Sequence, residues 1–237
     1  MAIEQKSFAG VKPLGHKAYG SIPHLPGSRL GAGDHHCHEG QARICTTKVR
    51  DRHDEVFVQE KLDGSCVAVA KIGSSVVALG RSGYPAQASQ FEQHQLFAAW
   101  VRENEARFDI LMDGERVVGE WLAQAHGTRY ELPHEPFVAF DLMIGHIRAP
   151  QARFQRLLGS RFVTPRMIAR GPLSIDQVRA ELRLSGHGAK DPVEGAVWRV
   201  ERRGNVDFLA KWVREDKKDG CFLPEMNGGA AIWNWRP

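Results

Sequence analysis

Short apolar runs separated by turn residues dominate the chain from residue 55 onward, and they predict β-strands. The first three runs, at residues 56–60, 66–71 and 76–79, are rich in Val and Ala and lie close together in the sequence. This closeness favours antiparallel pairing, because a parallel pair needs a long crossover connection. Before residue 55 the chain is rich in Gly, Pro and His without periodicity, which predicts an extended arm with little secondary structure.

The later patterns mix strands with helices. A capping-box pattern at residues 89–92 precedes apolar positions through Val101, and a second one at residues 174–177 opens another helix. Asp113-Gly114 predicts a hairpin turn. The predicted elements are strands at residues 108–112, 116–122, 137–144, 193–201 and 206–213, and helices at residues 89–101, 151–158 and 174–184. This mixture predicts an α+β fold with mostly antiparallel sheets.

Composition narrows the class of protein. Of the 237 residues 42% are hydrophobic and 25% charged, which excludes wholesale disorder. No apolar run approaches the roughly 20 residues that span a bilayer. A formal net charge of +4 is compatible with a phosphate-bearing partner, although a solvated basic surface also explains it. The four cysteines are scattered and the N-terminus has no signal-peptide pattern, so we expect free thiols and a cytoplasmic location.

Five short motifs place charged or aromatic residues on or beside the predicted strands. In chain order they are Lys61-Leu62-Asp63-Gly64, Glu120, Phe140-Asp141, Glu194-Gly195 and Lys211. Each motif alone has a structural explanation, such as a hairpin turn, an edge carboxylate or a core aromatic residue. Asp141 is harder to explain in this way, because a carboxylate in an apolar strand needs polar partners. The ordered set is therefore more informative than any of its members.

As a set, these residues resemble the motifs of the covalent nucleotidyltransferase superfamily of ATP-dependent ligases and capping enzymes. Within it they are most similar to the RNA ligases of the phage double-strand-repair type. Lys61-Leu62-Asp63-Gly64 matches the nucleophile motif with Glu60 before it, and Arg81 matches the basic residue after the first strands. The other motifs match in order, and residues 22–28 are similar to a segment ahead of the nucleophile in some RNA ligases.

The resemblance implies an ATP-grasp-like nucleotidyltransferase (adenylation) domain at residues 55–214, with an N-terminal arm at 1–54 packed on it and a tail at 215–237. It implies an ATP-dependent RNA ligase that works through lysyl-AMP and joins RNA ends bearing a 5′-phosphate and a 3′-hydroxyl. It also implies Mg²⁺ or Mn²⁺, and it leaves room for a partner enzyme, a kinase or phosphatase, that heals the ends.

The resemblance also implies a role for each matched residue. Lys61 would be the nucleophile, and its amine attacks only when neutral. Lys211 would neutralise the α-phosphate. Asp63 and Asp141 would not contact the substrate themselves but would orient the residues that do. Predicted contacts to the nucleotide are Glu60, Lys61, Gly64, Arg81, Glu120, Phe140, Glu194 and Lys211. Predicted metal ligands are Glu120 and Glu194, and predicted RNA contacts are Arg81, His24, Arg199 and Arg214.

The sequence departs from the family pattern in three respects. Val213 stands where a second lysine usually follows Lys211, and Arg199 stands where a lysine often closes the fourth motif. Only 26 residues follow Lys211, so we expect no C-terminal oligonucleotide-binding barrel or helical domain. The alternatives are a DNA nick ligase or another nucleotidyltransferase on the same fold, and a non-catalytic RNA-binding subunit.

Two further features have competing interpretations. His35, His36, Cys37 and His38 are adjacent, whereas zinc ligands are usually spaced, so a loop over the active-site mouth is an alternative to a structural metal site. In that alternative His38 and Glu39 approach ATP or RNA. Trp233 and Trp235 would either pack against the core or stack on bases.

Overall fold

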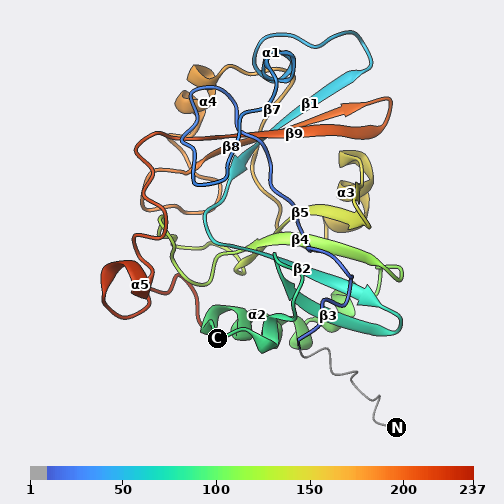
Figure 1. Ribbon diagram of the computed structural model, residues 1–237, viewed down its shortest axis with the longest axis vertical. Helices are drawn as coiled ribbons and strands as arrows, with labels where there is room; N and C mark the ends of the chain where they lie inside the picture. Colours follow the sequence, from blue (N-terminus) through green and yellow to red (C-terminus); the bar gives the residue numbers. More distant parts are fainter. Residues whose placement is uncertain (1–9) are drawn as a thin grey trace. The chain divides into compact units, whose positions relative to one another are not determined.

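The computed structural model describes residues 10–237, and its chain divides into two units that each contain one antiparallel sheet (Figure 1). The first unit comprises residues 65–121 and 139–162 together with the described residues up to Gly20. The second unit comprises residues 21–64, 122–138 and 163–237. The predicted α+β class with antiparallel sheets is confirmed.

The second unit is built on a four-stranded sheet in the order β7-β1-β8-β9. The strands are β1 (Asp54–Lys61), β7 (Met167–Arg170), β8 (Gly195–Arg202) and β9 (Asn205–Val213). Val58, Trp198 and Trp212 point to one face, where α1 (Glu39–Thr46) and α4 (Ile175–Glu181) contribute to the same hydrophobic core. Since side chains alternate along a strand, the remaining positions of β1, β8 and β9 point to the opposite face. A short helix, α5 (Pro224–Asn227), lies in the C-terminal segment.

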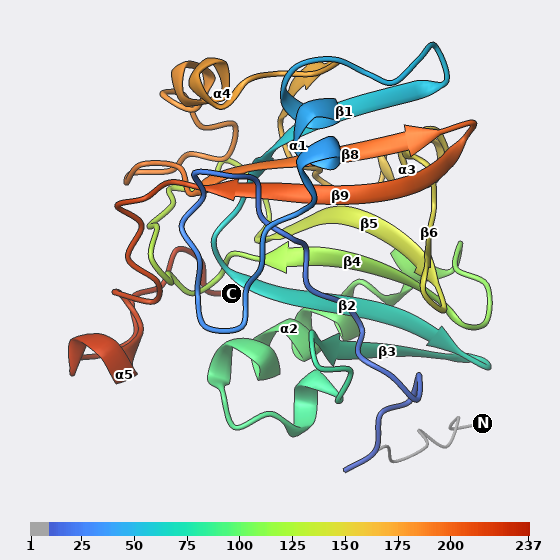
Figure 2. The same ribbon diagram turned by 45° about the horizontal axis from the view of Figure 1, so that its top comes forward.

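The first unit is built on a five-stranded sheet in the order β3-β2-β4-β5-β6 (Figure 2). The strands are β2 (Ser65–Ile72), β3 (Ser75–Gly80), β4 (Glu115–Trp121), β5 (Phe137–Ile144) and β6 (Ile147–Arg148). The helices are η1 (Ala86–Ala88), α2 (Glu92–Glu103), η2 (Glu105–Phe108) and α3 (Gln151–Leu158). An aromatic cluster of Phe97, Trp100 and Trp121 joins α2 to β4.

Most strand predictions are confirmed, but the hairpin predicted across Asp113-Gly114 is wrong. Residues 105–108 form a 3₁₀-helix, since Phe108 is fully buried against Trp100 and Phe162. β4 pairs instead with β2, with Val69 opposite Val117. Asp113 serves a different turn, because its carboxylate accepts a 2.7 Å hydrogen bond from the Gly73 N–H.

The helix predictions differ in their outcomes. The Ser174 capping box is confirmed, and its hydroxyl accepts a 3.3 Å hydrogen bond from the Gln177 N–H, although α4 ends at Glu181 rather than near Leu184. The Ser89 box is wrong, because α2 begins at Glu92 and the Ser89 hydroxyl lies 2.8 Å from His94 Nδ1. Helix α1 was not predicted. The division into an arm at 1–54, a domain at 55–214 and a tail at 215–237 stays a prediction.

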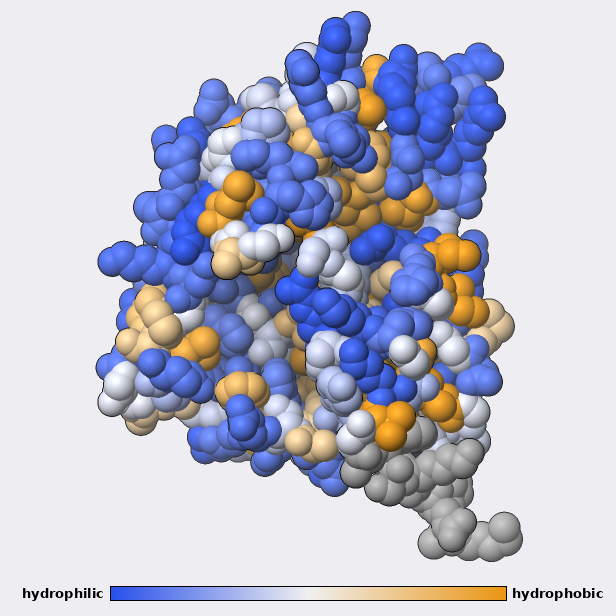
Figure 3. Space-filling model, viewed as in Figure 1, coloured by the Kyte–Doolittle hydropathy of each residue, from blue (hydrophilic) through white to orange (hydrophobic). Residues whose placement is uncertain are grey.

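The described helices are short, and α2, with 12 residues, is the longest of them. Within residues 10–237 none has the length and apolar character to cross a bilayer. Figure 3 shows a face on which hydrophilic residues predominate and apolar ones form small separate groups. Such a face is typical of a protein surface in contact with water.

Candidate active site

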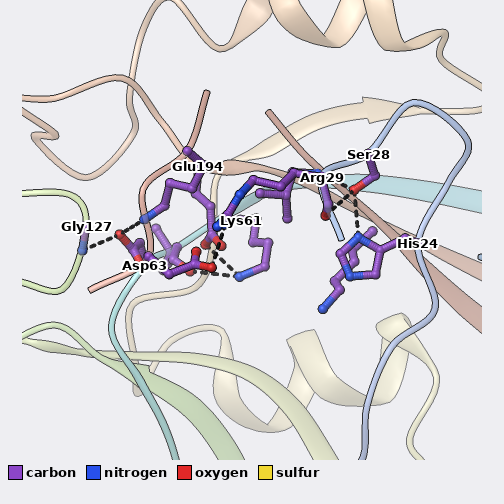
Figure 4. Close-up of polar contacts among 12 residues, drawn as sticks. His24, Ser28, Arg29, Lys61, Asp63, Gly127 and Glu194 are labelled. Atoms are coloured by element: carbon purple, nitrogen blue, oxygen red, sulfur yellow. Dashed lines mark hydrogen bonds and ion pairs between the residues drawn. The ribbon is translucent and has the colours of Figure 1, made fainter. Parts of the chain in front are cut away.

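Lys61 is the last residue of β1 and faces the start of β8. The strand register sets Lys61 opposite Gly195, so the preceding residue, Glu194, comes within reach of the amine. Lys61 Nζ donates a 2.6 Å hydrogen bond to Glu194 Oε2, as Figure 4 shows. The lysine side chain is 23% exposed and the Glu194 side chain 9%. Burial raises the pKa of the Glu194 carboxyl, and the Lys61 ammonium partly offsets this effect.

Lys211 lies on β9 and shares a sheet face with Lys61. Val197 is opposite Lys211 in the β8–β9 pair, and it is two residues beyond Gly195, the partner of Lys61. Residues directly opposite each other, or two apart on one strand, point to the same face of a sheet. The two lysines therefore project from one face of the sheet in the second unit.

The segment before α1 completes the surroundings of Lys211. The Leu25 N–H donates a 2.8 Å hydrogen bond to the Lys211 carbonyl oxygen, so this segment extends the sheet beyond β9. Lys211 Nζ is 3.7 Å from Asp34 Oδ1. His24, predicted to contact RNA, is buried, with Nε2 3.0 Å from Asp34 Oδ2 and Nδ1 2.6 Å from Ser28 Oγ. Burial, aided by Lys211, lowers the pKa of His24 to about 4, so its ring is neutral at pH 7.

Asp63 follows the nucleophile on the loop between β1 and β2. Its Oδ2 accepts hydrogen bonds from the Gly127 N–H at 2.9 Å and from Lys217 Nζ at 2.5 Å. Its own N–H donates a 3.1 Å hydrogen bond to the Tyr130 hydroxyl. The sequence indicated Asp63 as a supporting residue but did not indicate Lys217 or Tyr130. Nothing in the sequence distinguishes a buried lysine or tyrosine from an exposed one at these positions.

Glu60 points to the opposite face of β1 from Lys61. Its buried carboxylate accepts a 2.9 Å hydrogen bond from the Ser185 hydroxyl and a 2.8 Å one from the Gly186 N–H. Arg166 Nε lies 3.4 Å away. The structure therefore places this carboxylate among internal partners, and its predicted contact with the nucleotide stays a prediction.

Four predicted site residues belong to the first unit: Glu120 on β4, Phe140 and Asp141 on β5, and Arg81 after β3. Glu120 is opposite Cys66 of β2, and the exposed Arg81 donates a 3.3 Å hydrogen bond from Nη2 to the Gly20 carbonyl oxygen. The Phe140 ring meets Tyr19 edge-on, with centroids 5.3 Å apart.

Asp141 is fully buried, as its place in an apolar strand implied. Its Oδ2 accepts hydrogen bonds from the Tyr19 hydroxyl at 3.2 Å and from Arg148 Nε at 3.0 Å. The sequence predicted that this carboxylate would need partners. It did not indicate Tyr19, which is 122 residues away along the chain.

The two remaining predicted RNA contacts lie in the second unit. Arg199 on β8 is buried, with Nη1 3.9 Å from Glu201 Oε1. Arg214 is half-buried, and its N–H donates a 3.0 Å hydrogen bond to the Glu194 carbonyl oxygen. It also lines a cavity of about 840 Å³ together with Arg179, Lys190 and Trp212. Three of the basic side chains of this cavity, those of Arg179, Lys190 and Arg214, are ion-paired with acidic neighbours, as in the 2.7 Å contact between Arg214 and Asp216.

The histidine-rich segment pairs with the arm. The His24 N–H donates to the His35 carbonyl oxygen, and the Cys37 N–H donates to the His24 carbonyl oxygen, while His38 precedes the first residue of α1. Across residues 10–237 no three His, Cys, Asp or Glu side chains are grouped closely enough to hold a metal ion. The structural-metal interpretation of this segment therefore has no support in the described part of the chain.

The C-terminal segment pairs with the stretch after β4. The Ala125 N–H donates to the Ile232 carbonyl oxygen at 2.9 Å, and the Asn234 N–H donates to the Ala123 carbonyl oxygen at 2.8 Å. Trp233 is half-buried and forms an isolated bridge with Gln124. The tail is thus a structured part of the second unit.

The antiparallel sheet of the second unit thus carries a strand-end lysine with its carboxylate partner and, on the same face, a second lysine. The model of the RNA ligase family matches residues 54–213, and the chain belongs to this family. No curated protein matches the chain.

Several solved structures similar to this chain are RNA ligases. A Naegleria gruberi RNA ligase with PPi has a TM-score of 0.56 and 15% identity, over 87% of this chain and 62% of that one. A mutant of the Naegleria gruberi ligase with ATP and Mn has a TM-score of 0.53 and 14% identity, over 81% and 59%. An archaeal ATP-dependent RNA ligase has a TM-score of 0.44 and 21% identity, over 68% and 43%. The chain thus spans between 43% and 62% of the length of these proteins.

Proposed function

We propose that the chain is an ATP-dependent RNA ligase that seals a 5′-phosphate to a 3′-hydroxyl through a lysyl-AMP intermediate. The observation that carries the proposal is the Lys61 amine, held 2.6 Å from Glu194 on the sheet face that also bears Lys211. Membership of the RNA ligase family supports the choice of RNA. The chain spans only 59% to 62% of the two Naegleria gruberi structures, so the proposed activity and substrates depend on this site and not on those proteins.

The reaction has three balanced steps. The neutral Lys61 amine attacks the α-phosphorus of ATP, a phosphoramidate bond forms as the nitrogen releases a proton, and pyrophosphate leaves. The 5′-phosphate of an RNA end then attacks the same phosphorus, which regenerates the lysine and leaves AMP joined to that end. Finally a 3′-hydroxyl attacks the activated 5′-phosphorus and AMP leaves.

Lys211 would neutralise the charge that develops on the α-phosphate during the first two steps. Phe140 would stack on adenine, and Arg81, Glu120 and Gly64 would contact the rest of the nucleotide. Glu60 is a further proposed contact of the nucleotide, and its carboxylate is held by Ser185 and Gly186.

We propose that ATP binds together with a divalent cation. Mg²⁺ is usually held by one or two carboxylates and by the phosphates of the substrate, so a complete protein cage is not needed. Glu120 and Glu194 would supply the carboxylates, and the cation would offset the charge of the triphosphate. In the solved Naegleria gruberi ligase ATP is accompanied by Mn.

RNA recognition would depend on basic groups near the surface. Arg81 is exposed and Arg214 half-buried, and both would bind phosphates of the RNA backbone. His24 and Arg199 are buried, so they would act by positioning neighbouring groups of the site. We further propose that an end-healing kinase or phosphatase supplies the matched ends. A cytoplasmic location agrees with four free cysteines.

The test is covalent labelling with α-labelled ATP and Mg²⁺ or Mn²⁺, resolved on a denaturing gel. The protein should acquire a labelled adduct, and Lys61→Ala should abolish it because no other group replaces the amine. Lys48→Ala, at an exposed lysine before β1, is the control and should label like the wild type. An adduct on Lys61→Ala would refute the assignment of Lys61 as the nucleophile. A folded wild type that carries no AMP beforehand and still acquires no label would refute the proposal that the chain is a ligase.

Nicked duplexes of matched sequence then test the substrate. RNA and DNA nicks are offered side by side to the adenylylated protein, and sealing of the RNA nick should be faster. Preferential sealing of DNA would point to a DNA nick ligase on the same fold.

A further inference from the structure

Lys217 is a buried cation beside the nucleophile loop. It lies four residues beyond the end of β9, and its side chain has no exposure to solvent. Its Nζ is 2.5 Å from Asp63 Oδ2. An ammonium group removed from water is costly unless a carboxylate compensates it, so this contact joins the C-terminal segment to the loop after Lys61.

The surroundings leave this contact little freedom. The Gly127 N–H donates to the same carboxylate oxygen of Asp63, as Figure 4 shows. A Cβ atom at Gly127 would lie 2.2 Å from Lys217 Nζ and 3.1 Å from Asp63 Oδ2, so only glycine leaves room for the pair. Asp63 is thus held by segments 64 and 154 residues away along the chain.

Two ion pairs lie next to each other along the nucleophile motif. Lys61 is paired with Glu194, and Asp63 is paired with Lys217. The two pairs are linked electrostatically, because Asp63 raises the pKa of the Glu194 carboxyl and Lys217 lowers it. If Lys217 lost its charge, the Asp63 carboxylate would lose its ammonium partner, and the amine of Lys61, two residues earlier in the chain, would be a candidate to replace it.

We propose that Lys217 is a positioning residue for the Lys61 amine, acting through Asp63. By neutralising Asp63 it prevents this carboxylate from drawing the amine away from Glu194, so that the amine keeps one orientation. The inference rests on the proposed function in that Lys61 is taken as the nucleophile. It also makes the segment after β9 part of the catalytic apparatus.

The test compares Lys217→Met, which removes the charge at similar length, with Lys218→Met at the exposed neighbour. In single turnovers Lys217→Met should form lysyl-AMP roughly 10- to 100-fold more slowly, as expected for a misplaced reacting group. Its apparent affinity for ATP should be almost unchanged, and Lys218→Met should match the wild type. A wild-type rate for Lys217→Met would overturn the proposal.

A double variant separates positioning from simple loss of structure. Asp63→Asn combined with Lys217→Met removes both buried charges, and the side-chain amide oxygen introduced at this position can still accept the Gly127 N–H. The double variant should recover at least about a third of the lost activation free energy, because no buried anion competes for the amine. A double variant no faster than Lys217→Met would show that the carboxylate does not mediate the effect.

A measurement without ATP keeps this inference distinct from the proposed function. The amine of Lys61 is acetylated with trace acetic anhydride at one fixed pH, and peptide mass spectrometry gives the modified fraction. Labelling of Lys61 should slow by about threefold or more in Lys217→Met, because a new hydrogen bond to Asp63 protects the amine. Unchanged labelling would contradict positioning even if no protein forms an adduct, whereas a missing adduct in the wild type would count against the ligase itself.

Discussion

Gly195 is a residue of the candidate site whose backbone has very little room for a side chain. A Cβ atom there would lie 1.9 Å from the carbonyl oxygen of Trp212 on β9. This oxygen belongs to the backbone of the neighbouring strand and cannot rotate away. The close approach of β8 and β9 sets the position of Glu194, and through it the distance to Lys61.

Gly195→Ala should therefore destabilise the protein and displace Glu194. We expect the free energy of unfolding to fall by about 1–3 kcal/mol, as for other overpacked sites, with slower adenylylation. Denaturant unfolding measures the first effect and single-turnover labelling the second. Gly40→Ala, on the exposed start of α1 with nothing within 4 Å of its Cβ, should be neutral or slightly stabilising. Equal stability of the two variants would contradict the steric argument.

At the scale of elements, β1 and β7 are joined to the segment after α4 through buried polar groups. The ring of His187 accepts a 3.2 Å hydrogen bond at Nε2 from the Arg166 N–H, and its Nδ1 is 2.8 Å from His134 Nε2. Burial, together with His134 and Arg166, lowers the pKa of His187 to about 4. A protonated ring would lose its acceptor nitrogen and add charge near Arg166.

This pKa predicts how stability depends on pH. In the unfolded chain His187 binds a proton near pH 6.5, and in the folded protein only near pH 4. Its contribution to the free energy of unfolding is therefore complete above pH 6.5 and is lost as the pH falls toward 4. The loss is at most about 3 kcal/mol. His187→Gln should lose less stability than the wild type between pH 7.5 and 5 in urea unfolding. His35→Gln, at an exposed site, should follow the wild type, and an identical slope for His187→Gln would exclude this origin.

At the scale of the whole molecule, the candidate motifs are distributed between the two units. Lys61, Glu194 and Lys211 belong to the second unit, while Glu120 and Phe140 belong to the first. The chain passes from one unit to the other five times, and one passage directly follows Gly64 in the nucleophile motif. The second unit is further closed on itself by its C-terminal segment, in which Asn234 donates a side-chain hydrogen bond to the Leu122 carbonyl oxygen.

Removal of residues 230–237 should destabilise the second unit, because the segment supplies backbone and side-chain hydrogen bonds to residues 122–130. Each lost hydrogen bond should cost roughly 1 kcal/mol. Hydrogen exchange should accelerate at the Ala125 and Tyr130 amides, whose acceptors are Ile232 and Asn234. Removal of residues 236–237 alone is the control. Unchanged exchange in the longer deletion would show that the pairing contributes nothing.

Most of the strands, and the positions of the motif residues on them, were predictable from the sequence, whereas α1, β6 and β7 were not predicted. Alternation and turn residues are local, so the strands near Lys61, Glu194 and Lys211 were located correctly, and Asp141 was expected to need partners. The failures were also local. Ser89 and Asp113 had suitable patterns, but burial of Phe108 and other turn contacts prevailed over them.

Contacts between distant segments were decided only by the tertiary structure. Strand alternation separates Glu60 from Lys61, but Ser185 and Gly186 reach Glu60 only because the chain returns to it about half its length later. Lys217 stands in a charged run typical of a solvated surface, and its burial against Asp63 follows from the path of the chain after β9. The sequence by itself thus determined which residue types occur at which strand positions. Only the tertiary structure determined which charges are buried together, because burial and pairing depend on groups far apart in the chain.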